Sequence, residues 1–291
     1  MTAAVKELTI LSGKGGTGKT TLAGAFAVLA ERKVIADLDV DAPDLHIILQ
    51  PKILQEKEFY GMEKARIELD ECISCGLCLE TCRFDAISPN YVVDENFCEG
   101  CRACTFVCPT NAIKMVKHVA GRWFISETRY GPMVHGQLGV AEENSGKLVT
   151  VIRTQAKFTA QKEGYPLILL DGPPGIGCPV ISSLTGVKYA LVVAEPTQSG
   201  MHDLGRLFDL LEHFDVQAYL VVNKYDLNPE VTAEIERFAY DRGVRPVGRI
   251  PFDEAVVEAL VNAKPVIEYC DCPAGEAIKK IWERMVEEME L

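Results

Sequence analysis

Eight of the eleven cysteines fall into two runs with the same internal spacing. The runs are Cys72-x2-Cys75-x2-Cys78-x3-Cys82 and Cys98-x2-Cys101-x2-Cys104-x3-Cys108. Each cysteine of the first run recurs 26 positions later, and Ala86-Ile87 recurs as Ala112-Ile113. Such self-similarity predicts two pseudo-symmetric halves that share a small core. Three cysteines spaced two apart can surround one cubic cluster of iron and sulfide, and the fourth then points toward the other half.

The two runs resemble those of bacterial two-cluster ferredoxins, in which the fourth cysteine of each run ligates the other cluster. The resemblance implies an inserted α+β ferredoxin-like domain with two [4Fe-4S] clusters. It assigns one cluster to Cys72, Cys75, Cys78 and Cys108, and the other to Cys98, Cys101, Cys104 and Cys82. In the ferredoxin pattern, proline follows the fourth cysteine of a run. Pro109 follows Cys108 in this way, but Arg83 follows Cys82 and departs from the pattern. The alternative is a pair of zinc sites, but zinc has no use for a third cysteine at this short spacing.

A glycine-rich segment lies between a short apolar run at residues 8–11 and an apolar, helix-like segment at residues 20–30. A strand–loop–helix arrangement of this kind turns backbone N–H groups and a helix N-terminus toward phosphate oxygens. Lys19 is expected to reach the β- and γ-phosphates, and Thr20 to hold Mg²⁺. The nucleotide-binding residues predicted in this loop are Gly13, Lys14, Gly15, Gly16, Thr17, Gly18, Lys19, Thr20 and Thr21.

Lys14 is a second lysine, directly after the first glycine of the loop. This pattern resembles the deviant Walker A loop of the superfamily that contains MinD, ParA and the nitrogenase iron protein. The resemblance implies a P-loop ATPase that forms a homodimer, or a heterodimer of paralogues, with ATP sandwiched at the interface. It also implies that Lys14 contacts the partner's nucleotide and acts in catalysis with Lys19. The alternative is a solvated loop lysine.

The segment after residues 34–36 resembles the first switch of that superfamily. Asp39 is the residue expected to orient the attacking water, with Asp37 supporting the metal shell and Asp41 as a second candidate for the water. A carboxylate at a strand end can instead cap a helix.

Residues 167–175 resemble the Walker B strand and the second switch. Asp171 is expected to hold Mg²⁺ through water, and the amide of Gly172 or Gly175 to sense the γ-phosphate. The predicted Mg²⁺ site therefore comprises Thr20, Asp37, Asp39 and Asp171.

The base site is predicted after two later strands, at Asn223, Asp226, Pro251 and Asp253. Asn223 contacts adenine in the MinD-like proteins. However, Asn223-Lys224-Tyr225-Asp226 also fits the Asn-Lys-x-Asp sequence with which GTPases read guanine. The residues alone leave GTP possible, and the overall resemblance favours ATP.

The fold class expected is α/β, a mostly parallel P-loop NTPase sheet with helices on both faces. Strands are predicted near residues 7–12, 33–38, 167–171, 190–194, 217–222 and 245–250. The ATPase domain is discontinuous, at 1–61 and 119–291, and 62–118 is the ferredoxin-like insert. The segment 119–146 is interpreted as a loop or hairpin near the partner interface.

Three cysteines lie outside the two runs. Cys178 lies seven residues after Asp171, as does a cluster ligand of the nitrogenase iron protein, but no second cysteine occurs between Pro109 and Leu170. Cys270 and Cys272 are one residue closer than the Cys-x2-Cys pair with which scaffold ATPases of iron–sulfur assembly bridge subunits. A shared labile cluster and ordinary thiols are the alternatives for these residues.

The net charge of −12 disfavours a nucleic-acid surface, which needs clustered Lys and Arg. No apolar run reaches the length of a membrane span, and the first residues do not form a signal peptide. We therefore expect a cytoplasmic protein whose cysteines bind metal rather than form disulfides. Apolar residues keep helical spacing from Ile278 to Met289, and the acidic residues among them disfavour attachment to anionic lipid.

The sequence thus predicts a P-loop ATPase that couples nucleotide state to electron transfer through two [4Fe-4S] clusters, toward a redox or metallocofactor partner. One alternative is an ATPase that assembles or carries iron–sulfur clusters. The other is a spatial organiser of the MinD or ParA type whose clusters sense redox state. The electron donor and acceptor cannot be read from the residues.

Overall fold

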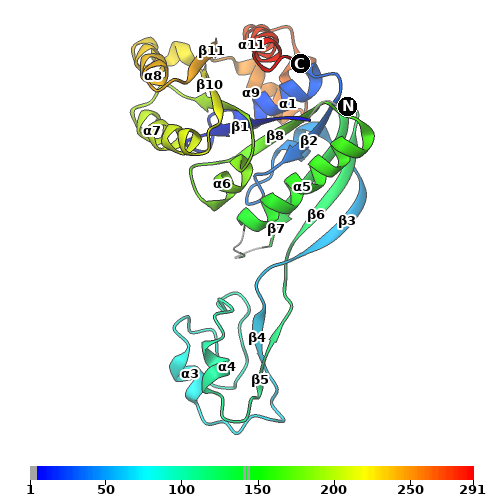
Figure 1. Ribbon diagram of the computed structural model, residues 1–291, viewed down its shortest axis with the longest axis vertical. Helices are drawn as coiled ribbons and strands as arrows, with labels where there is room; N and C mark the ends of the chain where they lie inside the picture. Colours follow the sequence, from blue (N-terminus) through cyan, green and yellow to red (C-terminus); the bar gives the residue numbers. More distant parts are fainter. Residues whose placement is uncertain (1–4, 140–141, 143–144) are drawn as a thin grey trace. The chain divides into compact units, whose positions relative to one another are not determined.

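The computed structural model describes residues 5–139, 142 and 145–291. The chain divides into two compact units (Figure 1). The first contains the described residues of the ranges 1–56, 123–137 and 145–291, and the second contains 57–122 and the described residues of 138–144. The second unit is thus somewhat wider than the predicted insert of 62–118.

A nine-stranded sheet organises the first unit, in the order β11-β10-β9-β1-β8-β2-β7-β6-β3. The strands are β1 (Lys6–Ser12), β2 (Lys33–Asp37), β3 (Lys52–Tyr60), β6 (Val119–Thr128), β7 (Gly131–Leu138), β8 (Leu167–Pro174), β9 (Tyr189–Ala194), β10 (Gln217–Asn223) and β11 (Arg245–Ile250). Every pairing from β11 across to β7 is parallel. The mostly parallel sheet and its six predicted strands are confirmed.

The segment 119–146 contributes strands that the sequence analysis did not place in the sheet. Strands β6 and β7 are neighbours joined by the two-residue turn Arg129–Tyr130, so the hairpin alternative is the correct one. Strand β3 lies beyond β6 at the edge of the sheet. Residues 52–58 of β3 are exposed on both faces, so they carry no buried alternation by which a sequence pattern could identify them.

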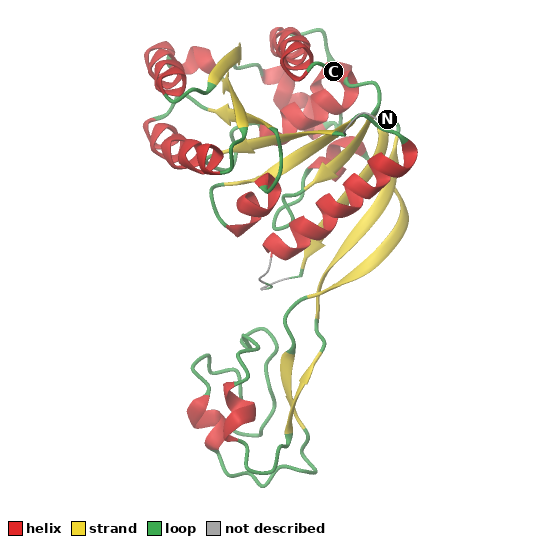
Figure 2. Ribbon diagram, in the orientation of Figure 1, coloured by secondary structure: helices red, strands yellow, loops and turns green. Residues whose placement is uncertain are grey.

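Helices cover both faces of the sheet (Figure 2). In the first unit they are α1 (Lys19–Leu29), α2 (Leu45–Leu49), α5 (Ser145–Glu163), α6 (Cys178–Leu184), α7 (Gln198–His213), the 3₁₀ turn η1 (Tyr225–Leu227), α8 (Pro229–Asp241), α9 (Glu254–Val261), α10 (Val266–Tyr269) and α11 (Pro273–Met289). Alternate residues of β1 point to opposite faces. Ile10 accordingly joins the core under α1 and α11, and Leu11 joins the core under α6, α7 and α8.

Helix α11 packs on the first of these cores, as its apolar spacing predicts. Ile278, Ile281 and Met285 are buried, and the ring of Trp282 lies 4.8 Å from that of Phe26 in α1. No helix among the described residues is long and apolar enough to cross a membrane.

The second unit has its own small core. Strands β4 (Lys64–Ile67) and β5 (Ile113–Val116) pair antiparallel, and the helices α3 (Leu77–Thr81) and α4 (Ala103–Val107) lie against one another. The repeated Ile87 and Ile113 are 8% and 6% exposed and belong to the same apolar cluster. The expectation of two halves sharing one core is therefore confirmed.

Lys33, at the start of β2, is a buried cation with a single hydrogen-bond acceptor. Its side chain is 3% exposed, and Nζ donates to the carbonyl oxygen of Ala30 at 2.7 Å. Burial lowers the pKa of Lys33 to about 8. Because the unfolded chain binds this proton more tightly than the folded chain does, the folded state gains stability as pH rises from about 8 toward the ordinary lysine pKa near 10.4.

We predict that Lys33→Met removes this pH dependence. Between pH 8 and 10 the free energy of unfolding of the wild type should rise by about 2–3 kcal/mol relative to the variant. Urea denaturation across this range measures the difference, with exposed Lys162→Met as the control. Parallel pH profiles for wild type and Lys33→Met would contradict the assignment.

Candidate functional site

The glycine-rich loop lies between β1 and α1, at the carboxyl end of the strand. Gly18 caps the N-terminus of α1 with φ of 93°, a left-handed conformation that glycine adopts without strain. The Nδ2 group of Asn223, at the end of β10, donates to the carbonyl oxygen of Thr17 at 2.8 Å. A Cβ atom on Gly18 would lie 2.3 Å from that Nδ2 atom. Asn223 thus fixes the loop from β10, which is separated from β1 by β9 in the sheet.

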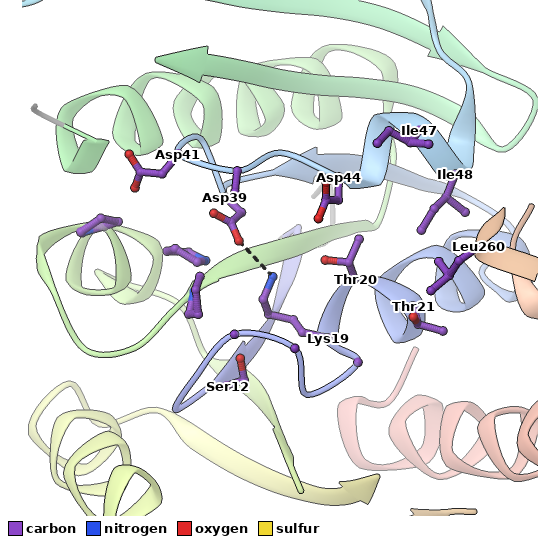
Figure 3. Close-up of a pocket in the computed structure, with 17 residues that line it drawn as sticks. Ser12, Lys19, Thr20, Thr21, Asp39, Asp41, Asp44, Ile47, Ile48 and Leu260 are labelled. Carbon is purple, nitrogen blue, oxygen red and sulfur yellow. Dashed lines mark ion pairs between the residues drawn. The ribbon is translucent and has the colours of Figure 1, made fainter. Parts of the chain in front are cut away.

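A cavity of about 690 Å³ opens over this loop, a volume within the range of small-molecule sites (Figure 3). Residues from the loop, from the segment after β2, from the end of β8 and from the helices α1, α2, α6 and α9 line it. They are Ser12, Gly15, Gly16, Gly18, Lys19, Thr20, Thr21, Asp39, Asp41, Ala42, Asp44, Ile47, Ile48, Pro173, Pro174, Pro179 and Leu260. The structure therefore brings much of the predicted phosphate loop and the first switch to one cavity.

Lys19 is the buried cation of this site. Its Nζ lies 2.9 Å from Oδ1 of Asp171 and 3.8 Å from Oδ2 of Asp39. Burial alone would lower the pKa of Lys19, but the carboxylates of Asp171 and Asp39 raise it above its ordinary value. The Oδ2 atom of Asp171 is buried and has no hydrogen-bond partner among the described residues. A buried carboxylate oxygen without a partner is an acceptor available to a ligand.

Asp37 has a different position from Asp39. It is 1% exposed, does not line the cavity, and accepts backbone hydrogen bonds from Asp39 at 3.1 Å and from Leu45 at 3.3 Å. Burial, followed by the charge of Asp171, raises the pKa of Asp37 well above its usual range. Asp37 therefore shapes the segment that presents Asp39, and its place among the Mg²⁺ residues stays a prediction.

Lys14 contacts residues of its own chain in this structure. Its Nζ donates to the hydroxyl of Thr197 at 3.0 Å and lies 3.8 Å from Oε2 of Glu195, which also pairs with Lys224. Neither Glu195 nor Thr197 was predicted from the sequence. Both residues follow β9, as Asp39 follows β2. Because the carboxyl ends of neighbouring parallel strands meet at one edge of a sheet, their position after a strand was the sequence signal for a place near the loop.

The four residues predicted to bind the base do not line the cavity, and three of them, Asn223, Asp226 and Asp253, bond to the backbone. Asp226 accepts from the amide of Phe252 at 2.7 Å. Asp253 caps α9 by accepting from Ala255 at 3.0 Å, and its other oxygen accepts from Ala274 at 3.2 Å. These bonds order the loop after β11 that contains Pro251. A role of the four residues in binding a base stays a prediction.

The amide of Gly175, proposed from the sequence as a γ-phosphate sensor, donates to the carbonyl oxygen of Ser12 at 2.9 Å. Gly172 lies against β1, where an added Cβ would be 2.8 Å from the carbonyl oxygen of Ile10. Both glycines thus hold β8 close to β1. Sensing would require the Gly175 amide to exchange its partner.

The second unit contains two cavities, each lined by four cysteines. Cavity A is defined by Cys72, Cys75, Cys78 and Cys108, and cavity B by Cys82, Cys98, Cys101 and Cys104. The fourth cysteine of each run thus lies in the cavity formed by the other run. All eight cysteines are free thiols in this structure.

Hydrogen bonds and burial distinguish individual thiols. The amide of Ala65 donates to Sγ of Cys98 at 3.4 Å in cavity B, and that of Ser74 to Sγ of Cys72 at 3.4 Å in cavity A. Burial, with the adjacent thiols of cavity B, raises the pKa of Cys104 to about 11. Within the described ranges, no three His, Cys, Asp or Glu side chains converge closely enough to be recognised as a site for one metal ion.

Comparison with known proteins places the chain in a family. Residues 8–266 match the CobQ/CobB/MinD/ParA nucleotide-binding domain, and this match covers more than half of the chain. The chain belongs to the CobQ/CobB/MinD/ParA family. It is a P-loop ATPase, in agreement with the loop, the buried Lys19 and the cavity above them.

The chain is similar to proteins that have different names. The chain is 35% identical over 289 residues to the uncharacterized protein MJ0578 of Methanocaldococcus jannaschii, covering 97% of each. It is 23% identical to the iron–sulfur cluster carrier protein of Pyrococcus horikoshii, covering 97% of this chain and 86% of the relative. The structure of MinD of Pyrococcus horikoshii complexed with Mg-ADP is similar with a TM-score of 0.60 and 16% identity, covering 98% of each chain. At this identity the likeness shows the fold alone.

The three cysteines outside the cavities lie in the ATPase unit. Cys178 is exposed at the start of α6. Cys272 is buried in the core beneath α11, and burial together with a hydrogen bond to Cys272 raises the pKa of Cys270 to about 12. The burial of Cys272 agrees with an ordinary thiol, and a ligand role for these three residues stays a prediction.

We predict that Gly18→Ala lowers the free energy of unfolding by about 1–3 kcal/mol, because alanine is strained at this left-handed position and its Cβ meets Asn223. Gly15→Ala is the matched control, since nothing lies within 4 Å of an added Cβ there. Its effect should be within about 0.5 kcal/mol. Urea denaturation without nucleotide measures both variants, and equal losses would contradict the role given to the Gly18 conformation.

Proposed function

We propose that this chain is an ATP-hydrolysing iron–sulfur protein of the cytoplasm that couples nucleotide state to electron transfer, toward a redox or metallocofactor partner. Residues 62–118 form the inserted ferredoxin-like domain that carries two [4Fe-4S] clusters. The observation that carries the proposal is the exchange of Cys82 and Cys108 between cavities A and B. This exchange is the ligand pattern of two-cluster ferredoxins.

The donor sets of the cavities fit such clusters. Each cavity offers four thiols, the ligand number of a [4Fe-4S] cluster, and apolar side chains such as Ile67 in A and Val93 in B limit the access of water. Backbone N–H groups already point at Cys72 and Cys98, and hydrogen bonds to sulfur stabilise the thiolate form. When bound, the clusters would supply one-electron redox chemistry.

The nucleotide cavity fits a triphosphate with Mg²⁺. The Thr20 hydroxyl and the Asp39 carboxylate line the cavity, whereas Asp171 is buried beside Lys19 and outside the lining. These two groups and the orphaned Oδ2 of Asp171 are hard oxygen donors, the kind that Mg²⁺ prefers. Lys19 would stabilise charge on the transferring phosphoryl group, and Asp39 would orient the attacking water. Asp37 would act through the backbone bonds that hold Asp39 in place.

Dimerisation around two nucleotides would give Lys14 a role in the partner's site. In this structure Thr197 and Glu195 hold the Lys14 ammonium within its own chain. Its side chain is 30% exposed, so it can exchange these partners for a phosphate of a second subunit. This interface and the trans-acting role rest on the deviant Walker A loop.

We predict that Lys14→Ala lowers ATP turnover at least tenfold, because it removes a positive charge from the transition state. The fold should be retained, since Lys14 lies in an open loop. Steady-state phosphate release measures turnover and circular dichroism measures folding, with exposed Lys162→Ala as the control. Unchanged turnover of Lys14→Ala would contradict the trans-acting role.

A second candidate function is that of an ATPase that carries iron–sulfur clusters to other proteins. The relative from Pyrococcus horikoshii that is named an iron–sulfur cluster carrier protein favours it. Either Cys178 or the pair Cys270 and Cys272 would then hold a transient cluster. Transfer of iron from the loaded protein to an apo-ferredoxin would support the carrier function, whereas permanently bound clusters support electron transfer.

We predict that Cys78→Ser loses about half of the bound iron after anaerobic reconstitution, because one of the two cavities loses a ligand. Cys178→Ser is the matched control and should retain all of it, since Cys178 lines neither cavity. Colorimetric iron analysis per chain measures both variants. Equal iron in Cys78→Ser and wild type would contradict the ligand assignment.

A further inference from the structure

The internal repeat allows the linings of cavities A and B to be compared position by position. An offset of 26 residues aligns Ile73 with Glu99 and Gly76 with Arg102. Ile73 lines cavity A, and the described residues that line this cavity include no acidic or basic side chain. Glu99 and Arg102 both line cavity B. The two cavities share a backbone design and differ in the charges at their walls.

Arg102 occupies a backbone position that disfavours it. Its φ is 65°, and the aligned Gly76 has φ of 80°, so both halves need a left-handed residue before the helix. Left-handed backbone costs a non-glycine residue about 1 kcal/mol or more, and strain of this kind concentrates at functional sites. At this position the first repeat avoids the cost with glycine, whereas at the aligned left-handed pair Ser74 and Gly100 it is the second repeat that has glycine. At Arg102 the second repeat accepts the cost and places a guanidinium at the wall of cavity B.

The guanidinium is also held in position. The Nη2 group of Arg102 donates to Oε2 of Glu63 at 2.6 Å, and the side chain is 58% exposed. No residue in the described lining of cavity A provides a corresponding cation. A second arginine, Arg83, directly follows Cys82 of cavity B, where the aligned Pro109 follows Cys108 of cavity A.

We propose that Arg102 raises the reduction potential of the cluster that cavity B would bind, relative to the same cluster without this arginine. This inference rests on the proposed function, because it requires the bound cluster. Reduction adds one electron, and so one negative charge, to a cluster held by four thiolates. The Arg102 cation favours that charge, whereas the part of the cavity A lining that the structure describes contains no cation.

The acidic residues near cavity B act in the opposite direction. Glu99 opposes reduction from the same wall, and Glu63 partly neutralises Arg102 while fixing it. Removal of the arginine would leave both carboxylates uncompensated. The effect of Arg102 is therefore measured most directly by substituting that residue alone.

The test is an anaerobic redox titration of the reconstituted full-length protein with dithionite as the electron donor, followed by electron paramagnetic resonance. The wild type should show two one-electron midpoints. In Arg102→Gln, one midpoint should fall. At a given potential, the ratio of reduced to oxidised cluster should then drop by up to about tenfold, which corresponds to about 59 mV for a one-electron couple. The other midpoint should not move.

Gly76→Arg is the reciprocal variant, because it introduces an arginine at cavity A. An added Cβ at Gly76 meets nothing within 4 Å, so space is available despite the left-handed backbone. It should raise the midpoint that Arg102→Gln leaves unchanged. Arg66→Gln, which removes an exposed arginine of the same unit outside both cavities, is the control for overall charge.

The outcomes separate this inference from the proposed function. Wild-type protein that binds far less than about eight iron atoms per chain would overturn the proposed function, and the inference with it. Full iron content with the same two midpoints in Arg102→Gln as in wild type would overturn the inference alone. A shift of both midpoints by the same amount in Arg102→Gln and Arg66→Gln would also overturn it, because it would show only an effect of net charge.

Discussion

The ATPase unit depends on a buried group of charges at the carboxyl ends of β1, β2 and β8. Asp37 and Asp171 are register partners on adjacent strands, both 1% exposed, and Lys19 reaches Asp171 from the start of α1. Burial and the adjacent charge of Asp171 raise the pKa of Asp37, whose carboxyl oxygens accept from the backbone amides of Asp39 and Leu45. Lys19 pairs with Asp171. The glycine-rich loop and the segment that presents Asp39 are thereby tied to the same strands.

The cysteine-rich unit follows a different structural principle. Its apolar core is small and the thiols themselves are part of it, since Cys78 and Cys98 are buried beside Ile67 and Ile87. Small domains often need metal or disulfides to supplement such a core. The fourth cysteine of each run lies in the cavity of the other run, so the proposed clusters would link the two halves of the repeat. The antiparallel pairing of β4 with β5 holds the same two halves together.

Much of this architecture follows from local sequence patterns. Buried parallel strands such as β8 and β9 are continuous apolar runs, and the spacing of the cysteines alone leads to their grouping in cavities A and B. Strand β3 was not predicted, and the hairpin of β6 and β7 was not placed in the sheet, because its position there depends on β2 and β3, which lie far away in the chain. The contacts of Lys14 with Glu195 and Thr197 were not predicted for the same reason. The backbone hydrogen bonds of Asp226 and Asp253 depend on the conformation of the loop after β11, which only the structure shows.

The edge position of β3 beside β6 has a topological consequence. These two strands carry the chain into and out of the cysteine-rich unit, and they are neighbours in the sheet. A segment whose ends meet side by side can be gained or lost without rethreading the remaining strands. The cysteine repeat between β3 and β6 therefore interrupts none of the parallel pairings from β11 to β7.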